Sequence, residues 1–337
     1  MSESVNRVCW VDTLKGLLIV LVVFGHAITN YSSIAESAQW NRICDAIYVF
    51  HMPAFFFVSG YLQSRSISNK TPDRKYCIKK IVSLAVPMIA FSVLYWTVKY
   101  VATQFTEGVV ANPQSIFDLL LMFIYPIGEY WFLYALLLIS LVDICFSKFK
   151  VPVVVQGIFW LVLLAATNWL PGLLPFFGKS VFPRMFRNGI YFLLGKVFFL
   201  KLEQHIKKSS AIIVLAVMLL SWIGWYTLGV FDRYTAFRLI LTCSTIIGLV
   251  IICNKFDSVI LRYLGKNSME IYLLHPYFIV LSKITILKVV PNIGVYFIVS
   301  TILSIALSCG TMVLISKVKF LDFFVKPLKY INNTRKD

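Results

Sequence analysis

Charge is scarce in this chain of 337 residues: Asp, Glu, Lys and Arg make up 14% of it, and only 15 residues are acidic. A soluble domain carries about 25% charged residues. Hydrophobic residues reach 59%, and the mean hydropathy is +0.80. This composition excludes an ordinary water-soluble domain and indicates a chain whose solvent is the lipid bilayer.

The shortage of acidic residues leaves a formal net charge of +17, which would also suit a nucleic-acid-binding protein. The distribution of the basic residues argues against that class. They form short clusters between apolar runs, and no basic stretch is interleaved with aromatic residues. We therefore expect no nucleic-acid partner.

Cysteine and histidine are too scattered to form a metal site or a disulfide framework. None of the seven cysteines belongs to a C-x-x-C pair, and none of the four histidines has the i, i+4 spacing of metal ligands. The chain also lacks a Walker loop and a Gly-x-Ser-x-Gly elbow. We expect no metal. The first apolar run carries Asp12 and Lys15 without a following cleavage site, so it is expected to stay as a membrane segment.

Long apolar runs dominate what remains. A spanning helix needs roughly 20 mostly apolar residues, and about ten runs approach or reach that length. The sequence therefore predicts an all-α, polytopic transmembrane helix bundle of about ten helices that forms one membrane domain over residues 1–337. A shorter run, 116–127, is expected to lie along the membrane interface. The ten runs are 11–28, 46–63, 81–101, 130–146, 151–170, 186–200, 211–230, 237–253, 268–289 and 294–316.

Lys and Arg alternate between rich and poor connections along the chain. The N-terminus, the C-terminus and the connections on their side of the membrane hold roughly three times as many as the other connections. The positive-inside rule then places both termini in the cytoplasm, with a short cytoplasmic tail at about 317–337. We expect a multi-pass protein of the inner cell membrane.

Ionisable groups at bilayer depth are costly and therefore mark functional sites. In the first run, Lys15 and His26 lie three turns apart on nearly one helix face, separated by about 16 Å along the axis. Asp12 is the i−3 neighbour of Lys15 and can neutralise it. This stripe is expected to line a polar path from a cytoplasmic mouth at Asp12 and Lys15 to His26 near the outer surface.

Further polar residues open later runs. His51 enters the second run at about the depth where His26 leaves the first, so the two imidazoles are expected near each other. Glu129 and Trp131 lie at the outer end of the fourth run, and Arg187 enters the sixth from outside. In the ninth run His275 lies a turn or two deeper than the cytoplasmic edge.

Each of these residues also has a purely structural interpretation. An interfacial histidine can hydrogen-bond a backbone carbonyl, and Trp131 stands where aromatic belts form. Glu129 can be a solvated loop residue. The basic cluster between Arg65 and Lys80 serves topology and binds anionic lipid equally well.

Four signatures in order resemble the acyltransferase-3 family of membrane acyltransferases, most closely its branch of fucose 4-O-acetylase-like sugar O-acetyltransferases. Two positions depart from the family pattern: Lys15 stands where many members have Arg, and Ser83 where a basic residue is common. The first change replaces a planar clamp with a point charge. The signatures are Trp10-x-Asp12-x-x-Lys15-Gly16 with Gly25-His26, Phe50-His51-Met52-Pro53, Trp131-Phe132-Leu133-Tyr134, and Ser268-Met269-Glu270-Ile271-Tyr272-Leu273-Leu274-His275.

The resemblance implies an acyl-CoA donor, usually acetyl-CoA, and as acceptor a sugar hydroxyl of a cell-surface polysaccharide or its lipid-linked precursor. His26 would then act as general base, because an imidazole titrates near neutral pH. His51 or Glu129 would hold the tautomer of His26.

The same resemblance suggests where the two substrates bind. Lys79 and Lys80 at the cytoplasmic mouth would contact the CoA phosphates, with Lys15 and Asp12 deeper along the path. The candidates for acceptor contacts are Trp131, Arg187 and His275. The rival interpretation is a transporter or exporter of the glycan or an acylated intermediate, since polytopic proteins with buried charges often transport. A structural subunit would not need the stripe.

Overall fold

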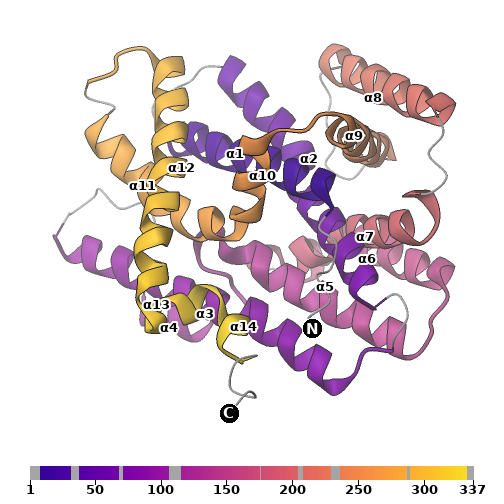
Figure 1. The fold of residues 1–337 in the computed structure, drawn as a ribbon, viewed down its shortest axis with the longest axis horizontal. Coiled ribbons are helices and arrows are strands. Elements are labelled where there is room, and N and C mark those ends of the chain that lie inside the picture. The colour runs from indigo at the N-terminus through magenta and orange to yellow at the C-terminus, as the bar shows by residue number, and fades with distance from the viewer. Residues whose placement is uncertain are drawn as a thin grey trace. The chain divides into compact units, whose positions relative to one another are not determined.

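The computed structural model describes residues 8–31, 38–67, 71–105, 115–174, 176–203, 208–228, 236–286 and 289–331. Every regular element within these ranges is a helix (Figure 1). The predicted all-α class is therefore confirmed. Helices suit a bilayer because each backbone N–H and C=O group is satisfied within its own segment.

Eight helices in the described ranges are long and apolar enough to cross a membrane, which confirms a polytopic protein. Several of them turn large apolar side chains outward, as lipid-facing helices do; in α8, Ile213 and Leu220 are 63% and 66% exposed. The eight are α1 (Cys9–Tyr31), α2 (Ala38–Ile67), α3 (Arg74–Phe105), α5 (Trp131–Lys148), α6 (Val153–Leu173), α8 (Lys208–Leu228), α9 (Ala236–Lys255) and α12 (Ile293–Lys317).

The other two predicted runs are also helical. Helix α7 (Phe182–Val197) has only 16 residues and ends in the π-helical turn η3 (Phe198–Leu202). Helix α11 (Ser268–Thr285) has 18 residues and carries Glu270, His275 and Lys283. Both are shorter or more polar than the eight, so their crossing of the membrane stays a prediction.

The predicted interfacial run contains the five-residue helix α4 (Ile116–Leu120), which is too short to cross. Its apolar side chains are exposed, with Phe117 and Leu120 both at 68%. The 3₁₀ turns η1 (Gly128–Tyr130) and η2 (Phe177–Lys179) lead into α5 and α7.

The predicted tail is not simply extended, because it contains two short helices, α13 (Lys319–Val325) and α14 (Pro327–Ile331), that pack against α3. The fully buried Asp322 accepts hydrogen bonds from Lys329 Nζ and from the Tyr330 hydroxyl at 2.7 Å. Burial would raise the pKa of Asp322, but the bonds from Lys329 and Tyr330 outweigh it and hold the pKa below its ordinary value. This hydrogen-bonded group holds the two helices together.

The chain divides into two compact units. The first comprises Met1–Val58 and Phe198–Val313, and the second comprises Ser59–Val197 and Leu314–Asp337. Helix α2 runs through the boundary, so that its first part belongs to one unit and its last turns to the other.

In the first unit, α1 is the interior helix: 67% of its most apolar window is buried, against 11% for α8. The short helix α10 (Val259–Lys266) lies against the first half of α1 (Figure 1). A Cβ atom at Gly16 would collide with the carbonyl of Leu261, and one at Gly265 with the carbonyl of Asp12. The two glycines therefore allow the backbones of α1 and α10 to touch.

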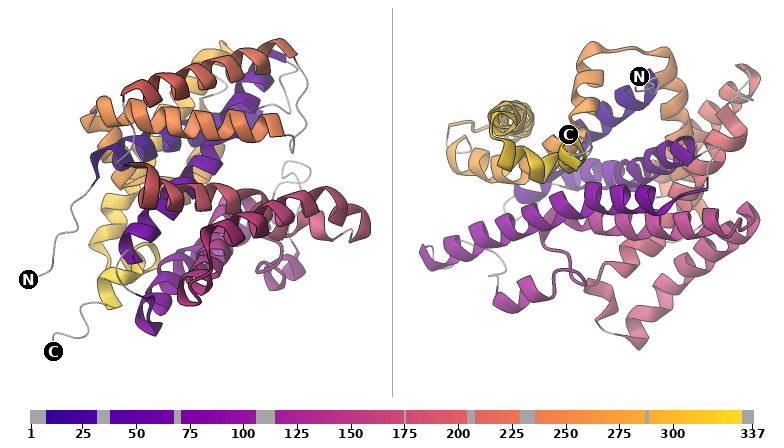
Figure 2. Two further views of the ribbon diagram at one scale, coloured as in Figure 1. Left: turned by 90° about the vertical axis from the view of Figure 1, so that its right-hand side faces the viewer. Right: turned by 60° about the horizontal axis from the view of Figure 1, so that its bottom comes forward.

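In the second unit, α7 packs against both α5 and α6 (Figure 2). The ring of Trp160 on α6 lies directly over Gly189 of α7, where a Cβ atom would overlap it. The last turns of α2 approach α7 equally closely, because a Cβ atom at Gly60 would collide with the carbonyl of Phe192. Small residues bring helices together in the same way in other membrane bundles.

Candidate functional site

His26 lies in a cluster of three histidines and a tyrosine, all within the first unit. Its ring centroid is 5.3 Å from that of His275 on α11 and 6.3 Å from that of Tyr48 on α2. The Tyr48 ring in turn lies 4.9 Å from the ring of His51. His26, His51 and His275, all predicted site residues, therefore belong to one cluster.

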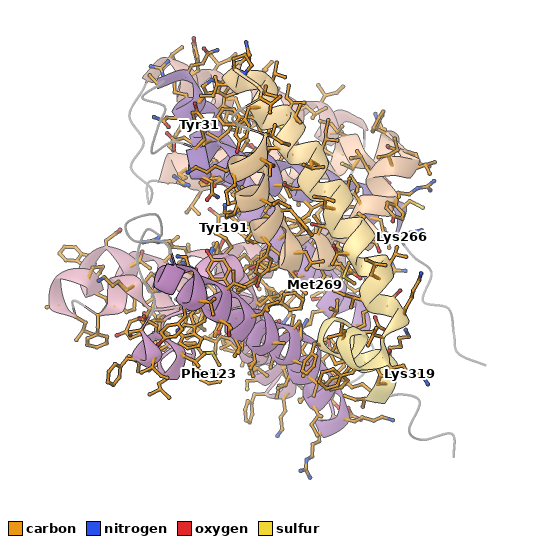
Figure 3. The ribbon with its side chains drawn as sticks, turned by 90° about the vertical axis from the view of Figure 1, so that its left-hand side faces the viewer. Tyr31, Phe123, Tyr191, Lys266, Met269 and Lys319 are labelled. Carbon is orange, nitrogen blue, oxygen red and sulfur yellow. The ribbon has the colours of Figure 1, made fainter. Side chains whose placement is uncertain are left out.

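Two backbone features bring these side chains together. Gly25 leaves room for Tyr48, since a Cβ atom there would lie 2.7 Å from Tyr48 Cε1. Lys266 and Met269, labelled in Figure 3, flank the break at Asn267 that separates α10 from α11. Because α10 rests on the first half of α1, helix α11 begins beside α1 and runs along it toward His26.

The tautomers of two histidines follow from their hydrogen bonds. His51 Nδ1 lies 2.8 Å from the carbonyl oxygen of Ile47, and His275 Nδ1 lies 2.8 Å from that of Tyr272. A carbonyl only accepts hydrogen bonds, so in both rings Nδ1 carries the proton and Nε2 offers a lone pair. The carbonyl bonds expected of isolated histidines are thus present, and they orient the rings of the cluster.

His275 is the most enclosed member. Its side chain is fully buried, and within the described ranges its Nε2 atom has no hydrogen-bond partner. A buried polar atom without a partner is costly, and it marks a position where a ligand or a water molecule completes the bonding.

Asp12 and Lys15 are half-buried near the start of α1, where α10 covers the helix. They lie on the first turns of α1, whereas His26 lies near its end, as the sequence predicts. Asp12 and Lys15 are therefore separated along α1 from His26 and its histidine cluster. A polar path that joins the two levels stays a prediction.

The other predicted site residues belong to the second unit. Glu129 lies in η1 and acts electrostatically on Arg184 of α7, whose guanidinium stands 5.5 Å from the centroid of the Trp131 ring. Arg187, one turn further along α7, is half-buried. Whether Glu129 serves His26 stays a prediction, as do the roles of Trp131 and Arg187.

Lys79 and Lys80 are half-buried on the first turns of α3. The side chain of Lys80 makes no hydrogen bond or ion pair within the part of the chain that the structure describes. It is therefore open to an anionic partner. Among the described residues no group of three or more His, Cys, Asp and Glu side chains could hold a metal ion.

The sequence reasoning missed one group of residues, a buried ion pair in the second unit. Lys196 Nζ of α7 contacts Asp143 Oδ1 of α5 at 2.5 Å, and both side chains are almost fully buried. The sequence does contain a signal for this pair: Asp143 and Lys196 carry opposite charges and both lie inside predicted membrane runs, where charged residues pair with one another.

Taken together, these features define a multi-pass membrane protein with a cluster of three histidines, two of them buried. The acyltransferase-3 model, described as an acyltransferase domain, matches residues 9–313. The chain therefore belongs to the acyltransferase-3 family of membrane acyltransferases.

Three curated relatives are similar to this chain. Nodulation protein NolL of Mesorhizobium japonicum is 34% identical over 39% of this chain and 33% of its own length. Nodulation protein NolL of Sinorhizobium fredii is 32% identical over 59% of this chain and 51% of its own. The chain thus spans about a third and a half of these two relatives.

Inner membrane protein YcfT of Escherichia coli is 24% identical over 82% of this chain and 81% of its own length. No solved structure matches the chain significantly. The matches support multi-pass membrane localisation.

Proposed function

We propose that this acyltransferase transfers an acetyl group from acetyl-CoA to a hydroxyl group of a sugar in a cell-surface polysaccharide or its lipid-linked precursor, as in the fucose 4-O-acetylase-like branch. The observation that carries the proposal is the arrangement of His26 beside His275, whose lone pair is buried without a partner. An alcohol is a poor nucleophile at neutral pH and needs a base within hydrogen-bond reach.

His26 is the general base in this proposal. Its imidazole takes the proton of the attacking sugar hydroxyl while the oxygen forms a bond to the thioester carbonyl carbon of the donor. The carbon–sulfur bond then breaks, and the proton on His26 neutralises the leaving thiolate. The donor supplies the activated acyl group, and the residues of the chain hold and move the proton.

His275 orients the acceptor. Because its Nδ1 is bonded to a carbonyl, its Nε2 can only accept a hydrogen bond, here from a second hydroxyl of the sugar. A sugar offers several adjacent hydroxyls, so an acceptor beside His26 distinguishes the attacking hydroxyl from its neighbours. In this role His275 stays a substrate-binding residue, and the tautomer of His26 is held by Glu129 or His51.

The donor binds at the cytoplasmic side, where its phosphates meet Lys79 and Lys80, with Asp12 and Lys15 further along α1. The unpaired ammonium group of Lys80 fits an anionic ligand of this kind. Both termini are cytoplasmic in this proposal, and the membrane is the inner cell membrane.

The test is the substitution His26→Ala in the full chain. We expect the surface polysaccharide of cells that carry this variant to lose the mass increment of the acetyl group, at an unchanged protein level. If the polysaccharide is still acetylated in the His26→Ala cells, the proposed function is wrong. Glycan that accumulates inside the cell would instead identify an exporter of glycan or of an acylated intermediate.

A further inference from the structure

A buried polar network, built on the ion pair of Asp143 and Lys196, joins four helices of the second unit. Lys196 Nζ donates to Asp143, to Gln156 Oε1 at 3.1 Å and to Ser147 Oγ at 3.4 Å. Gln63 Nε2 donates to Asp143 Oδ2 at 2.8 Å and to the carbonyl of Ser140 at 3.1 Å. All three donor positions of the ammonium group and both carboxylate oxygens are therefore used.

Lys80 stands beside this network without joining it. Asp143 is close enough to act electrostatically on the ammonium group of Lys80. Yet the side chain of Lys80 makes no hydrogen bond or ion pair within the described ranges, whereas Lys196 and Gln63 are both bonded to the carboxylate. Among the described residues, Asp143 therefore pairs with Lys196 and acts on Lys80 without pairing with it.

Another polar atom is left open at the same place. Gln63 is 2% exposed, and its Oε1 atom has no hydrogen-bond partner among the described residues. Both amide hydrogens of Gln63 are bonded within the protein, and Oε1 is an acceptor that needs an N–H or O–H group as its partner. An unpaired ammonium and an unpaired carbonyl oxygen together suit a ligand that carries both an anionic group and an N–H or O–H group.

We propose that Lys196 is a positioning residue that neutralises Asp143 and thereby keeps Lys80 free to bind an anionic group of the donor. Without Lys196, the carboxylate of Asp143 is left buried without its cation, and Lys80 is a cation on which this carboxylate already acts. Lys80 then turns to Asp143, because a buried unpaired charge is far costlier than a rearranged lysine. This inference rests on the proposed function, since it takes acyl-CoA as the donor.

The proposal makes the two halves of the ion pair unequal. The variant Lys196→Gln can keep the hydrogen bonds to Gln156 and Ser147, but it leaves Asp143 without its cation, and Asp143 then pairs with Lys80. We expect the affinity for coenzyme A to fall about tenfold, because the donor loses one charge-assisted hydrogen bond. Asp143→Asn removes the competing carboxylate, so Lys80 stays free and binding is unchanged. The double variant Asp143→Asn/Lys196→Gln recovers the wild-type affinity.

The measurement is isothermal titration of coenzyme A into the full chain in detergent, with the thermal midpoint recorded for each variant. Lys80→Met shows the size of the Lys80 contribution, and Lys148→Met, an exposed lysine at the end of α5, is the matched control. Where a variant does not survive purification, the KM for acetyl-CoA in native membranes replaces the titration.

Two results would overturn the inference. Equal losses of affinity in Asp143→Asn and Lys196→Gln, or a double variant without recovery, mean that the ion pair only holds the helices together. An unchanged affinity in Lys80→Met means that Lys80 does not touch the donor. Neither result bears on His26→Ala, whose loss of acetylation tests the proposed function separately.

Discussion

At the scale of single residues, backbone carbonyls hold the ring of His275. Nδ1 of His275 is fixed by the carbonyl of Tyr272 at 2.8 Å and faces that of Ile271 at 3.2 Å. The carbonyl of His26 itself accepts a hydrogen bond from Asn30 Nδ2 at 3.0 Å. An acceptor atom held in a fixed orientation beside the ring of His26 suits the division into a substrate-binding histidine and a base.

His275→Gln and His275→Leu test this division. The amide oxygen of glutamine can replace the lone pair of Nε2, whereas leucine removes it. We expect kcat/KM to fall about tenfold further in the leucine variant than in the glutamine variant, because a substrate hydroxyl loses its acceptor. Initial rates with varied acceptor concentration check this. Equal activity in the two variants would contradict a role for Nε2.

Part of the candidate site can be predicted from the sequence alone. The helical spacing of Lys15 and His26 follows from sequence alone, and the structure keeps it. The contact between His26 and His275 does not follow, because hydropathy starts the ninth run at the cytoplasmic edge. In the structure the rings of His26 and His275 lie 5.3 Å apart, so the outer position expected for His26 and the near-cytoplasmic position expected for His275 cannot both hold. The partners Asp143 and Lys196 come from separate runs, and no periodic pattern links them.

At the scale of elements, the contact of α1 with α10 sets the position of α11 and therefore of His275. Lys283 Nζ of α11 donates to the carbonyl of Asn30 at 2.7 Å, and Ser282 and Ser300 bond α11 to α12. Helix α11 is thus attached to both neighbours beyond the histidine cluster. A shift of α10 on α1 would move His275 relative to His26.

Gly16→Ala should therefore lower both stability and activity. The added Cβ atom would overlap the carbonyl of Leu261, and overpacking of this kind costs about 1–3 kcal/mol. Gly310→Ala in α12 is the matched control, because a Cβ atom there meets nothing within 4 Å. Thermal midpoints in detergent and rates at saturating substrate check both variants. A Gly16→Ala protein that matches Gly310→Ala would show that α1 and α10 do not need this contact.

At the scale of the whole molecule, the number of crossings decides which connections face the cytoplasm. Eight helices meet the criteria of length and apolarity, and α7 and α11 do not. With eight crossings or with ten, the number is even, so the C-terminus lies on the same side of the membrane as the N-terminus. The connections after α7 and after α9 distinguish eight crossings from ten. Both lie in the cytoplasm if α7 crosses the membrane, and both lie outside if α7 stays within one leaflet.

The charges favour ten crossings. The connection after α7 contains Lys201, Lys207 and Lys208, and the one after α9 contains Lys255, Arg262 and Lys266. With only eight crossings both would lie outside, against the positive-inside rule, whereas ten crossings keep them in the cytoplasm. The short length of α7 is not decisive, because a polar helix packed against α5 and α6 is shielded from lipid.

Cysteine labelling in intact cells tests the count. Starting from a chain without its native cysteines, Lys255→Cys should react with a membrane-impermeant maleimide only after the cells are permeabilised, and Arg42→Cys should react without permeabilisation. Both side chains are exposed, so a lack of reaction reports the side of the membrane and not burial. Reaction of Lys255→Cys in intact cells would show that α7 does not cross. It would also place the end of α9 on the outer side of the membrane. The proposal of a cytoplasmic donor site and an outer histidine cluster would then need a different topology.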